Sequence, residues 1–356
     1  MVPRKIALGA ILLVYIIFFS QIALGANSYQ VFEKKLKINN KNFTVKGVIV
    51  DLNTKKLKMQ TVLAKNQIGQ VESLESMVKR KKGVIGINGT FFSAYDAYKE
   101  PYGNLMIDGR LIRKGNGERC SVGILPGNEV IFGYVKWDIS VIFSTYSEEG
   151  TELPYIYPVH TLNPVRMPGW RGYTLFTPEG GKEVLYSDGY NIVVEKQKVI
   201  KIVYGKTSIP PQGFVLNTGS LCPPDNLLNS NVTLKIEPEN QENVLWSKSY
   251  AVLEAGPYLV KEGKIIADPL KENFTHYKIK DGSFARSGIG VTKNEKLLLV
   301  TVNSATVKEL ALIMQKLGAF HAMNLDGGAS SGLYVNGKYL TKPGRLLSNA
   351  LVISLN

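Results

Sequence analysis

The most informative stretch of the chain reads Asn324-Leu325-Asp326-Gly327-Gly328-Ala329-Ser330-Ser331-Gly332-Leu333-Tyr334-Val335. Its adjacent glycines, Gly327 and Gly328, let the backbone approach a ligand closely. Asp326 supplies a charge, and Ser330 and Ser331 supply short hydrogen-bonding groups. The same pattern also fits an ordinary Asp-Gly-Gly turn that leads into a strand. The neighbouring segments must therefore decide between a simple turn and a functional site.

The segment before this stretch predicts the clearest helix of the chain. Thr306 and Glu309 have the spacing of a capping box. The apolar stripe that follows at helical spacing consists of Leu310, Ile313, Met314 and Leu317. Gly318 fits the C-terminal stop, so a helix is predicted over Thr306–Leu317. The chain then passes through His321, which we interpret as structural because it alternates with a buried face.

A second stretch with the composition of a site follows a short apolar run, Val84-Ile85-Gly86-Ile87, which is typical of a buried strand. This strand delivers Asn88-Gly89-Thr90-Phe91-Phe92 at its end. There the Asn88 amide can point into a cleft, while the two aromatic residues anchor it or form a wall on which a sugar stacks. A turn followed by two core aromatic residues is the alternative.

Two charged residues stand out between these stretches. Glu254 lies beside the Gly256-Pro257 turn, and Arg286 precedes the predicted strand Gly288-Ile289-Gly290-Val291. A guanidinium at that position can present a fork of donors to a phosphate or a carboxylate. Taken alone, each residue also fits a surface or structural ion pair.

The composition is that of a globular protein. The chain has 356 residues, of which 44% are hydrophobic and 20% charged, so it can bury a large core. Alternating apolar residues predict hairpin strands over residues 29–61, and helical spacing predicts a helix that ends at Gly83. No repeat, low-complexity tract or interdomain linker is evident. We therefore predict an α+β fold of mainly antiparallel twisted sheets with a few packed helices, forming a single domain over residues 27–356.

The first 26 residues differ from the rest of the chain. Arg4 and Lys5 precede an apolar run over residues 6–19, and Ala23-Leu24-Gly25-Ala26 offers small residues at a cleavage site. We interpret residues 1–26 as a secretory signal peptide. An uncleaved N-terminal membrane anchor is the alternative, because the apolar run approaches the length of a spanning helix. Both interpretations predict a secreted or otherwise extracytoplasmic protein.

The chain is strongly basic, with a formal net charge of +14. A basic protein outside the cytoplasm meets anionic polymers, and we expect phosphodiester-linked wall polymers, acidic polysaccharides or lipid headgroups rather than nucleic acid. Cysteines and histidines are too scattered to suggest zinc ligands. Cys120 and Cys222 can form at most one disulfide. The sequence does not indicate the oligomeric state.

Five segments, in this order, resemble the phosphodiester glycosidase family, the domain shared by bacterial exopolysaccharide-associated proteins and the animal enzyme that uncovers mannose 6-phosphate. The segments are Asn88–Phe92, Ala255–Pro257, Arg286–Val291, Glu309–Ala311 and Asn324–Ser331. The resemblance extends from about Lys46 to Asn356. Thr90 and Ala329 stand where the family commonly has glycine, so the loop geometry there depends on whether a positive φ is needed.

The resemblance implies hydrolysis of a sugar-1-phosphodiester at the anomeric carbon, with release of a free sugar and a phosphomonoester. We expect no cofactor and assign no metal ligands, and the sequence does not indicate whether the reaction depends on a metal. A phosphomonoester has a second pKa of about 6. As a leaving group it therefore depends less on protonation than a sugar alkoxide does. We expect Asp326 to be the catalytic carboxylate, Arg286 to clamp the phosphate and Glu254 to be a candidate second carboxylate. The expected substrate-binding residues are Asn88, Gly89, Asn324, Gly327, Gly328, Ser330 and Ser331.

Two other functions stay open from the sequence. The same cleft and basic surface fit a non-catalytic binder of anionic glycopolymers. A metal-assisted phosphodiesterase would instead cut the P–O bond, with Asp326, Asn88 and Asn324 as hard oxygen ligands.

Overall fold

The computed structural model describes residues 28–355, apart from residues 148, 166–171, 185–187 and 240–243. The predicted signal peptide or anchor, residues 1–26, lies outside the described residues. Strands account for 51% of the residues of the structure and helices for 14%. The fold is therefore mostly β, and the predicted α+β single-domain architecture is wrong. Segments between the expected strands form further short strands and turns, because few of them carry apolar residues at helical spacing.

Three antiparallel sheets build the main body. The first sheet has the order β1 (Tyr29–Ile38), β2 (Lys41–Asp51), β22 (Lys296–Ala305), β21 (Phe284–Thr292), β23 (Ala319–Asn324), β19 (Tyr258–Lys261) and β20 (Lys264–Ile265). The second has the order β25 (Lys338–Thr341), β24 (Leu333–Val335), β4 (Ile85–Asn88), β26 (Asn349–Leu355) and β3 (Leu57–Leu63). The third has the order β6 (Arg110–Arg113), β5 (Leu105–Ile107), β18 (Ala251–Glu254), β7 (Ser121–Ile124) and β8 (Val130–Gly133).

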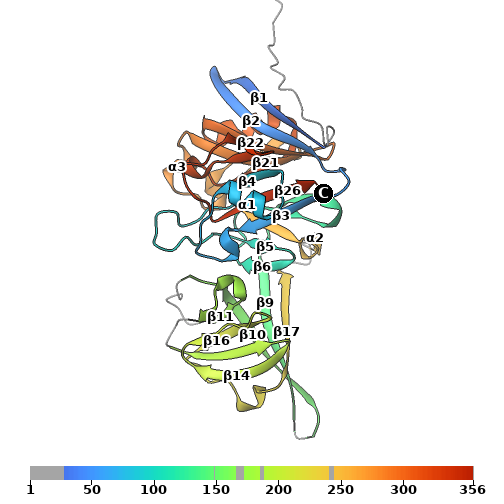
Figure 1. Cartoon of the computed structure of the whole chain (residues 1–356), viewed down its shortest axis with the longest axis vertical. Coiled ribbons are helices and arrows are strands. Elements are labelled where there is room, and N and C mark those ends of the chain that lie inside the picture. The colour runs from blue at the N-terminus through green and yellow to red at the C-terminus, as the bar shows by residue number, and fades with distance from the viewer. Residues whose placement is uncertain (1–27, 148, 166–171, 185–187, 240–243, 356) are drawn as a thin grey trace, which may run out of the picture.

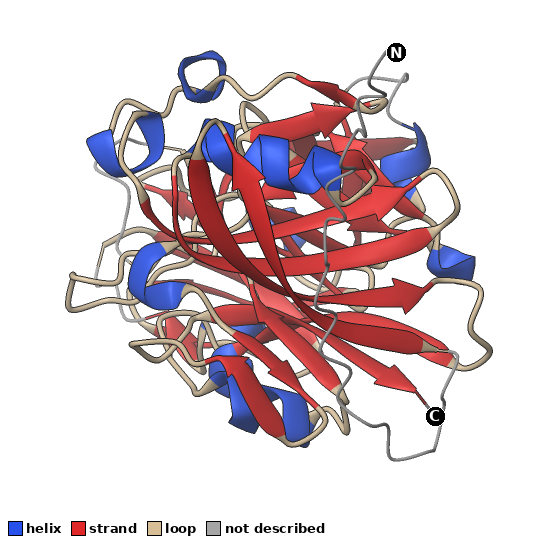
Figure 2. Cartoon of the chain, turned by 90° about the horizontal axis from the view of Figure 1, so that it is seen from above, coloured by secondary structure: helices blue, strands red, loops and turns tan. Residues whose placement is uncertain are grey.

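Side chains from all three sheets meet in one buried core. Val48 and Ile289 come from the first sheet, Ile87 from the second, and Val122 and Leu253 from the third. Because side chains alternate along a strand, the first and second sheets each have a second apolar face to cover. The helix α4 (Val307–Lys316) packs on the first sheet and α1 (Leu74–Arg80) on the second, and Figure 2 shows helices outside the layers of strands.

The predicted helix over residues 306–317 is confirmed as α4. Its N-terminus is a capping box: the Glu309 N–H donates to the Thr306 hydroxyl at 3.1 Å, and the Thr306 N–H donates to the Glu309 carboxylate at 2.8 Å. Gly318 follows the helix with a φ of 89°. Two further α-helices of the described residues, α2 (Val244–Ser247) and α3 (Tyr277–Lys280), are single turns.

Residues 137–238 form a closed barrel between β8 and β18, at the lower end of the molecule in Figure 1. Its strands have the order β10 (Glu152–Leu162), β11 (Tyr173–Phe176), β16 (Gly213–Gly219), β13 (Tyr190–Glu195), β14 (Lys198–Tyr204), β17 (Asn231–Pro238) and β9 (Trp137–Tyr146). In addition, β12 (Glu183–Val184) pairs with β15 (Thr207–Ser208). The barrel core, with Phe143 and Leu216, continues into the third sheet through Met106 and Val252, so the barrel is packed onto the main body.

Two further sequence expectations concern the cysteines and the membrane. Cys120 is buried and Cys222 is exposed, and both are free thiols, so the disulfide considered from the sequence does not form. Within residues 28–355, allowing for the gaps, no helix has the length and apolar character needed to cross a membrane.

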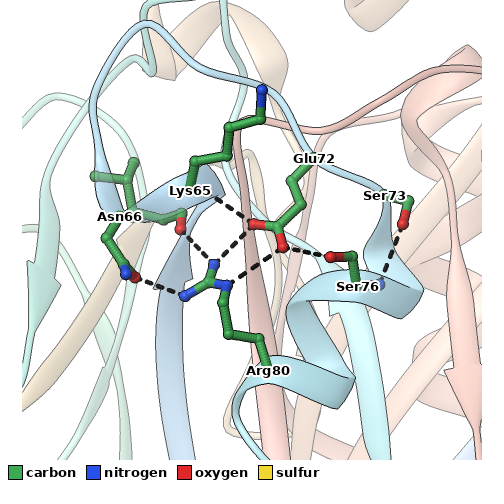
Figure 3. Close-up of polar contacts among 7 residues, drawn as sticks. Lys65, Asn66, Glu72, Ser73, Ser76 and Arg80 are labelled. Atoms are coloured by element: carbon green, nitrogen blue, oxygen red, sulfur yellow. Dashed lines mark hydrogen bonds and ion pairs between the residues drawn. The ribbon is translucent and has the colours of Figure 1, made fainter.

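An ion pair between the buried carboxylate of Glu72 and the last residue of α1, Arg80, holds the segment before the helix in place (Figure 3). The Glu72 side chain is 8% exposed, and Arg80 Nη2 lies 2.7 Å from its Oε2. The Ser76 hydroxyl and the Lys65 N–H donate to the same carboxylate at 2.6 and 2.8 Å. Burial acts to raise the pKa of Glu72, but the hydrogen bonds from Arg80, Lys65 and Ser76 outweigh it and the pKa is lowered. Through its backbone Glu72 also pairs with Leu347, at 2.9 Å in each direction, and so fixes the loop before β26.

Replacement of Arg80 tests this anchor. Arg80→Met should lower the free energy of unfolding by about 3 kcal/mol at neutral pH, because it leaves the Glu72 carboxylate buried without its cation. Lys79→Met is the matched control: Lys79 pairs with Glu75 at 2.6 Å, but its side chain is 67% exposed, so the loss should stay below about 1 kcal/mol. Urea unfolding followed by circular dichroism measures both, and equal losses would contradict the prediction.

Candidate active site

The Asp326 loop, residues 325–332, connects β23 in the first sheet to β24 in the second. The Leu325 N–H donates to the Ser287 carbonyl at 2.9 Å, and the Asp326 N–H donates to the Gly89 carbonyl at 3.1 Å. The loop is therefore pinned between β21 and the end of β4. The fold thus brings together the two stretches that the sequence analysis singled out.

Asp326 carries the half-buried carboxylate of this loop. The Gly327 N–H donates to its Oδ1 at 2.8 Å, and the Ser330 hydroxyl bonds to the same side chain. Burial raises the pKa of Asp326 to about 6, although these hydrogen bonds and the positive charges of Arg345 and Arg286 act to lower it. Such a carboxylate is mostly ionised at neutral pH and still basic enough to accept a proton.

Arg286, on β21, is 2% exposed and places a fixed positive charge beside this loop. Its Nε donates to the Ala305 carbonyl at 2.9 Å, and its Nη2 donates to the Gly282 carbonyl at 2.7 Å and to the Lys278 carbonyl. Burial lowers the pKa of Arg286 to about 10, so the guanidinium stays cationic at neutral pH. Its Nη1 faces the loop, since a Cβ added to Gly327 would lie 3.6 Å from that atom. Asp326 and Arg286 therefore lie at one place.

Asn88, the last residue of β4, is 1% exposed and its carboxamide joins three segments. Its Nδ2 donates to the Asp326 carbonyl at 2.7 Å. Its Oδ1 accepts from the Ser287 hydroxyl at 2.6 Å and from the Gly332 N–H at 3.0 Å, so both lone pairs of this oxygen are engaged. Asn88 therefore holds both ends of the Asp326 loop through hydrogen bonds to Asp326 and Gly332. Its expected contact with substrate stays a prediction.

The other predicted binding residues surround the same loop. Gly89 accepts from the Asp326 N–H, while Gly327, Gly328 and Ser330 belong to the loop itself. Asn324 is fully buried and its Nδ2 donates to the Gly256 carbonyl at 2.8 Å. The Asn324 Oδ1 and the Ser331 hydroxyl are buried without a hydrogen-bond partner among the described residues. Direct substrate contacts of all these residues stay predictions.

The two residues that replace the expected glycines fit the loops without strain. Thr90 and Ala329 are not among the described residues that have a positive φ. The small side chains are therefore compatible with the backbone at both positions.

Glu254 ends β18 and is 2% exposed. Its carbonyl accepts a hydrogen bond from the hydroxyl of Thr90. Thr90 directly follows Gly89, whose carbonyl accepts from the Asp326 N–H. Its carboxylate turns toward Asn104, whose N–H and Nδ2 donate to Oε2 at 3.1 and 2.6 Å. Burial raises the pKa of Glu254 to about 7, opposed by the Asn104 hydrogen bond and the charge of Arg119. Burial therefore raises the pKa of both carboxylates, and the catalytic role expected for Glu254 stays a prediction.

Three residues beside the Asp326 loop escaped the sequence analysis. Arg345 Nη2 donates to the Tyr95 hydroxyl at 2.8 Å, and Arg345 Cζ lies 4.7 Å from the centroid of that ring. Lys278 Nζ lies 5.5 Å from the same centroid. These residues come from segments far apart in the chain and belong to no motif, so only the general basic character of the sequence hinted at them.

A family comparison covers the C-terminal part of this site. Residues 188–354 match the phosphodiester glycosidase family. The matched range contains Glu254, Arg286 and the whole Asp326 loop, whereas Asn88 and Gly89 precede it. No curated protein sequence matches the chain.

Solved structures share the fold at low sequence identity. A hypothetical protein from Synechocystis is 22% identical with a TM-score of 0.74, over 92% of this chain and 62% of its own. A protein from Burkholderia pseudomallei that is inferred to be exported is 18% identical with a TM-score of 0.66, over 88% of this chain and 74% of its own. The catalytic domain of zebrafish N-acetylglucosamine-1-phosphodiester alpha-N-acetylglucosaminidase, auto-inhibited by its pro-peptide, is 15% identical with a TM-score of 0.53, over 93% of this chain and 85% of its own. The family resemblance seen in the sequence is confirmed, because residues 188–354 match the phosphodiester glycosidase family.

Proposed function

We propose that the protein hydrolyses a sugar-1-phosphodiester at the anomeric carbon. The family match over residues 188–354 supports glycosidase chemistry in general. The observation that carries the proposal for this chain is the Asp326 carboxylate, with its pKa raised to about 6, beside the buried cation of Arg286. The pair offers a base or nucleophile and a stabilising charge in one place.

The reaction breaks the bond between the anomeric carbon and the phosphate oxygen and adds water. Asp326 either attacks the anomeric carbon or takes a proton from the attacking water. The departing oxygen keeps the electron pair, and the positive charge of Arg286 stabilises the phosphomonoester anion that leaves. Asn88 and Ser330 hold the Asp326 loop in register during this step.

Replacement of the carboxylate tests the proposal. Asp326→Asn should lower kcat/KM by about 10³-fold, because the amide is neither a base nor a nucleophile. Asp108→Asn, at an exposed turn of the third sheet, is the matched control and should change little. The substrate is the 4-nitrophenyl ester of N-acetylglucosamine 1-phosphate, the sugar phosphate named for the zebrafish relative.

The same substrate separates the competing functions. Cleavage at the anomeric carbon releases 4-nitrophenyl phosphate, which gives colour only after a phosphatase is added. Cleavage of the P–O bond releases 4-nitrophenol directly, and its loss with a chelator would identify a metal-assisted phosphodiesterase. No turnover of any sugar-1-phosphodiester, together with salt-sensitive binding of anionic glycopolymers, would favour a binding protein.

The pH dependence follows from the state of Asp326. Because the reaction needs the ionised carboxylate, kcat/KM should rise with pH through a midpoint near 6, the pKa of this residue. Initial rates across the acidic and neutral range measure the profile. A flat profile in the wild type would show that Asp326 is not the titrating group.

We also propose that the domain acts outside the cytoplasm, on cell-wall or extracellular glycopolymers. The N-terminal pattern, the net charge of +14 and the exported relative support this location. If residues 1–26 are a cleaved signal, N-terminal sequencing of the exported protein should begin at Asn27. A chain that keeps residues 1–26 and sediments with membranes would indicate the anchor instead.

A further inference from the structure

A cluster of accessible cationic and aromatic groups lies beside the Asp326 loop. Tyr95 is 79% exposed, Lys278 is exposed and Arg345 is partly exposed. The guanidinium of Arg345 and the ammonium of Lys278 both lie over the Tyr95 ring. The hydrogen bond from Arg345 lowers the pKa of Tyr95, and the positive charges of Arg345 and Lys278 lower it further. The three residues form one positive surface, which we name the Arg345 cluster.

Backbone hydrogen bonds anchor the chain on both sides of Arg345. One residue before it, the Gly344 N–H donates to the Ala329 carbonyl of the Asp326 loop at 2.8 Å. Two residues after it, Leu347 is paired with Glu72, whose carboxylate is tied to α1 as Figure 3 shows. The backbone at Arg345 is therefore tied to the Asp326 loop before any ligand binds, which lowers the entropic cost of binding.

The accessible cations differ from Arg286 in what they can offer a ligand. Arg286 is 2% exposed and spends Nε and Nη2 on carbonyl groups of its own chain. Arg345 has five N–H donors, and within the described part of the chain it gives one hydrogen bond, to Tyr95. Arg286 also fixes Lys278, because its Nη2 donates to the Lys278 carbonyl.

We propose that Arg345, with Lys278 and the Tyr95 ring, is the binding site for the phosphate of the leaving group. The inference rests on the proposed function, and it assigns direct phosphate contact to Arg345 and leaves Arg286 as a fixed charge behind Asp326. Two accessible cations match a phosphate that gains negative charge as the sugar departs. The aromatic ring between them can stack on the group that the phosphate carries.

The test measures phosphate binding apart from turnover. Binding of methyl phosphate to the full chain is measured by calorimetry. Arg345→Met should weaken it by about tenfold or more, the loss of a charge-assisted bond, and Lys278→Met should weaken it by a smaller factor. Arg110→Met removes the same charge from an exposed residue paired with Glu179 and should leave binding unchanged. Thermal unfolding confirms that each variant is folded.

A pH profile distinguishes an electrostatic role of Arg345 in the site from a merely structural one. The charge of Arg345 lowers the pKa of Asp326, so Arg345→Met should move the acidic limb of kcat/KM to higher pH, while Arg345→Lys keeps the charge and restores the limb. Unchanged methyl phosphate binding in a folded Arg345→Met variant would overturn the inference. Binding that depends on Arg345 in a wild type that hydrolyses no sugar-1-phosphodiester would support the inference and overturn the proposed function.

Discussion

The carboxamide of Asn88 is the contact on which the candidate site depends. It donates to the backbone of Asp326 and accepts from Ser287 and Gly332, so it joins the second sheet, the first sheet and the Asp326 loop at one point. Only an amide of this size both donates and accepts in these directions, since a carboxylate lacks the donor. Each buried polar group left unpaired costs about 1–3 kcal/mol. The position of the Asp326 loop is therefore coupled to the packing of the two sheets.

Burial then sets the charges of the site. Arg286 loses its water but keeps its proton, because a guanidinium is strongly basic and three backbone carbonyls accept from it. Desolvation raises the pKa of Asp326, and the charges of Arg345 and Arg286 oppose the rise. An aspartate side chain in water has a pKa of about 3.9, so its carboxylate is a weak base. The balance of the two effects, a pKa of about 6, gives a carboxylate suited to work near neutral pH.

Features that depend on neighbouring residues were predictable, and those that depend on distant pairing were not. The capping box of α4, the strand before Asn88 and the turn at Asp326 each follow from a few adjacent residues, and the structure has all three. The sequence analysis did not predict the barrel, because its first strand, β9, pairs with its last strand, β17, and no linker marks the ends of the barrel in the sequence. Tyr95 and Arg345 are 250 positions apart in the chain, so their contact has no local signal. The supporting role of Asn88 likewise depends on partners that only the fold supplies.

In the proposed reaction, the chemistry of the leaving group reduces the need for a proton donor beside Asp326. A sugar alkoxide must be protonated as it leaves, and glycosidases therefore place a second carboxyl group beside the first. A phosphomonoester has a second pKa near about 6 and leaves as a stable anion, so positive charge can take the place of a proton donor. Glu254 turns its carboxylate toward Asn104, while Arg286 and Arg345 direct their charges at Asp326. This distribution of charge fits the proposed phosphodiester substrate.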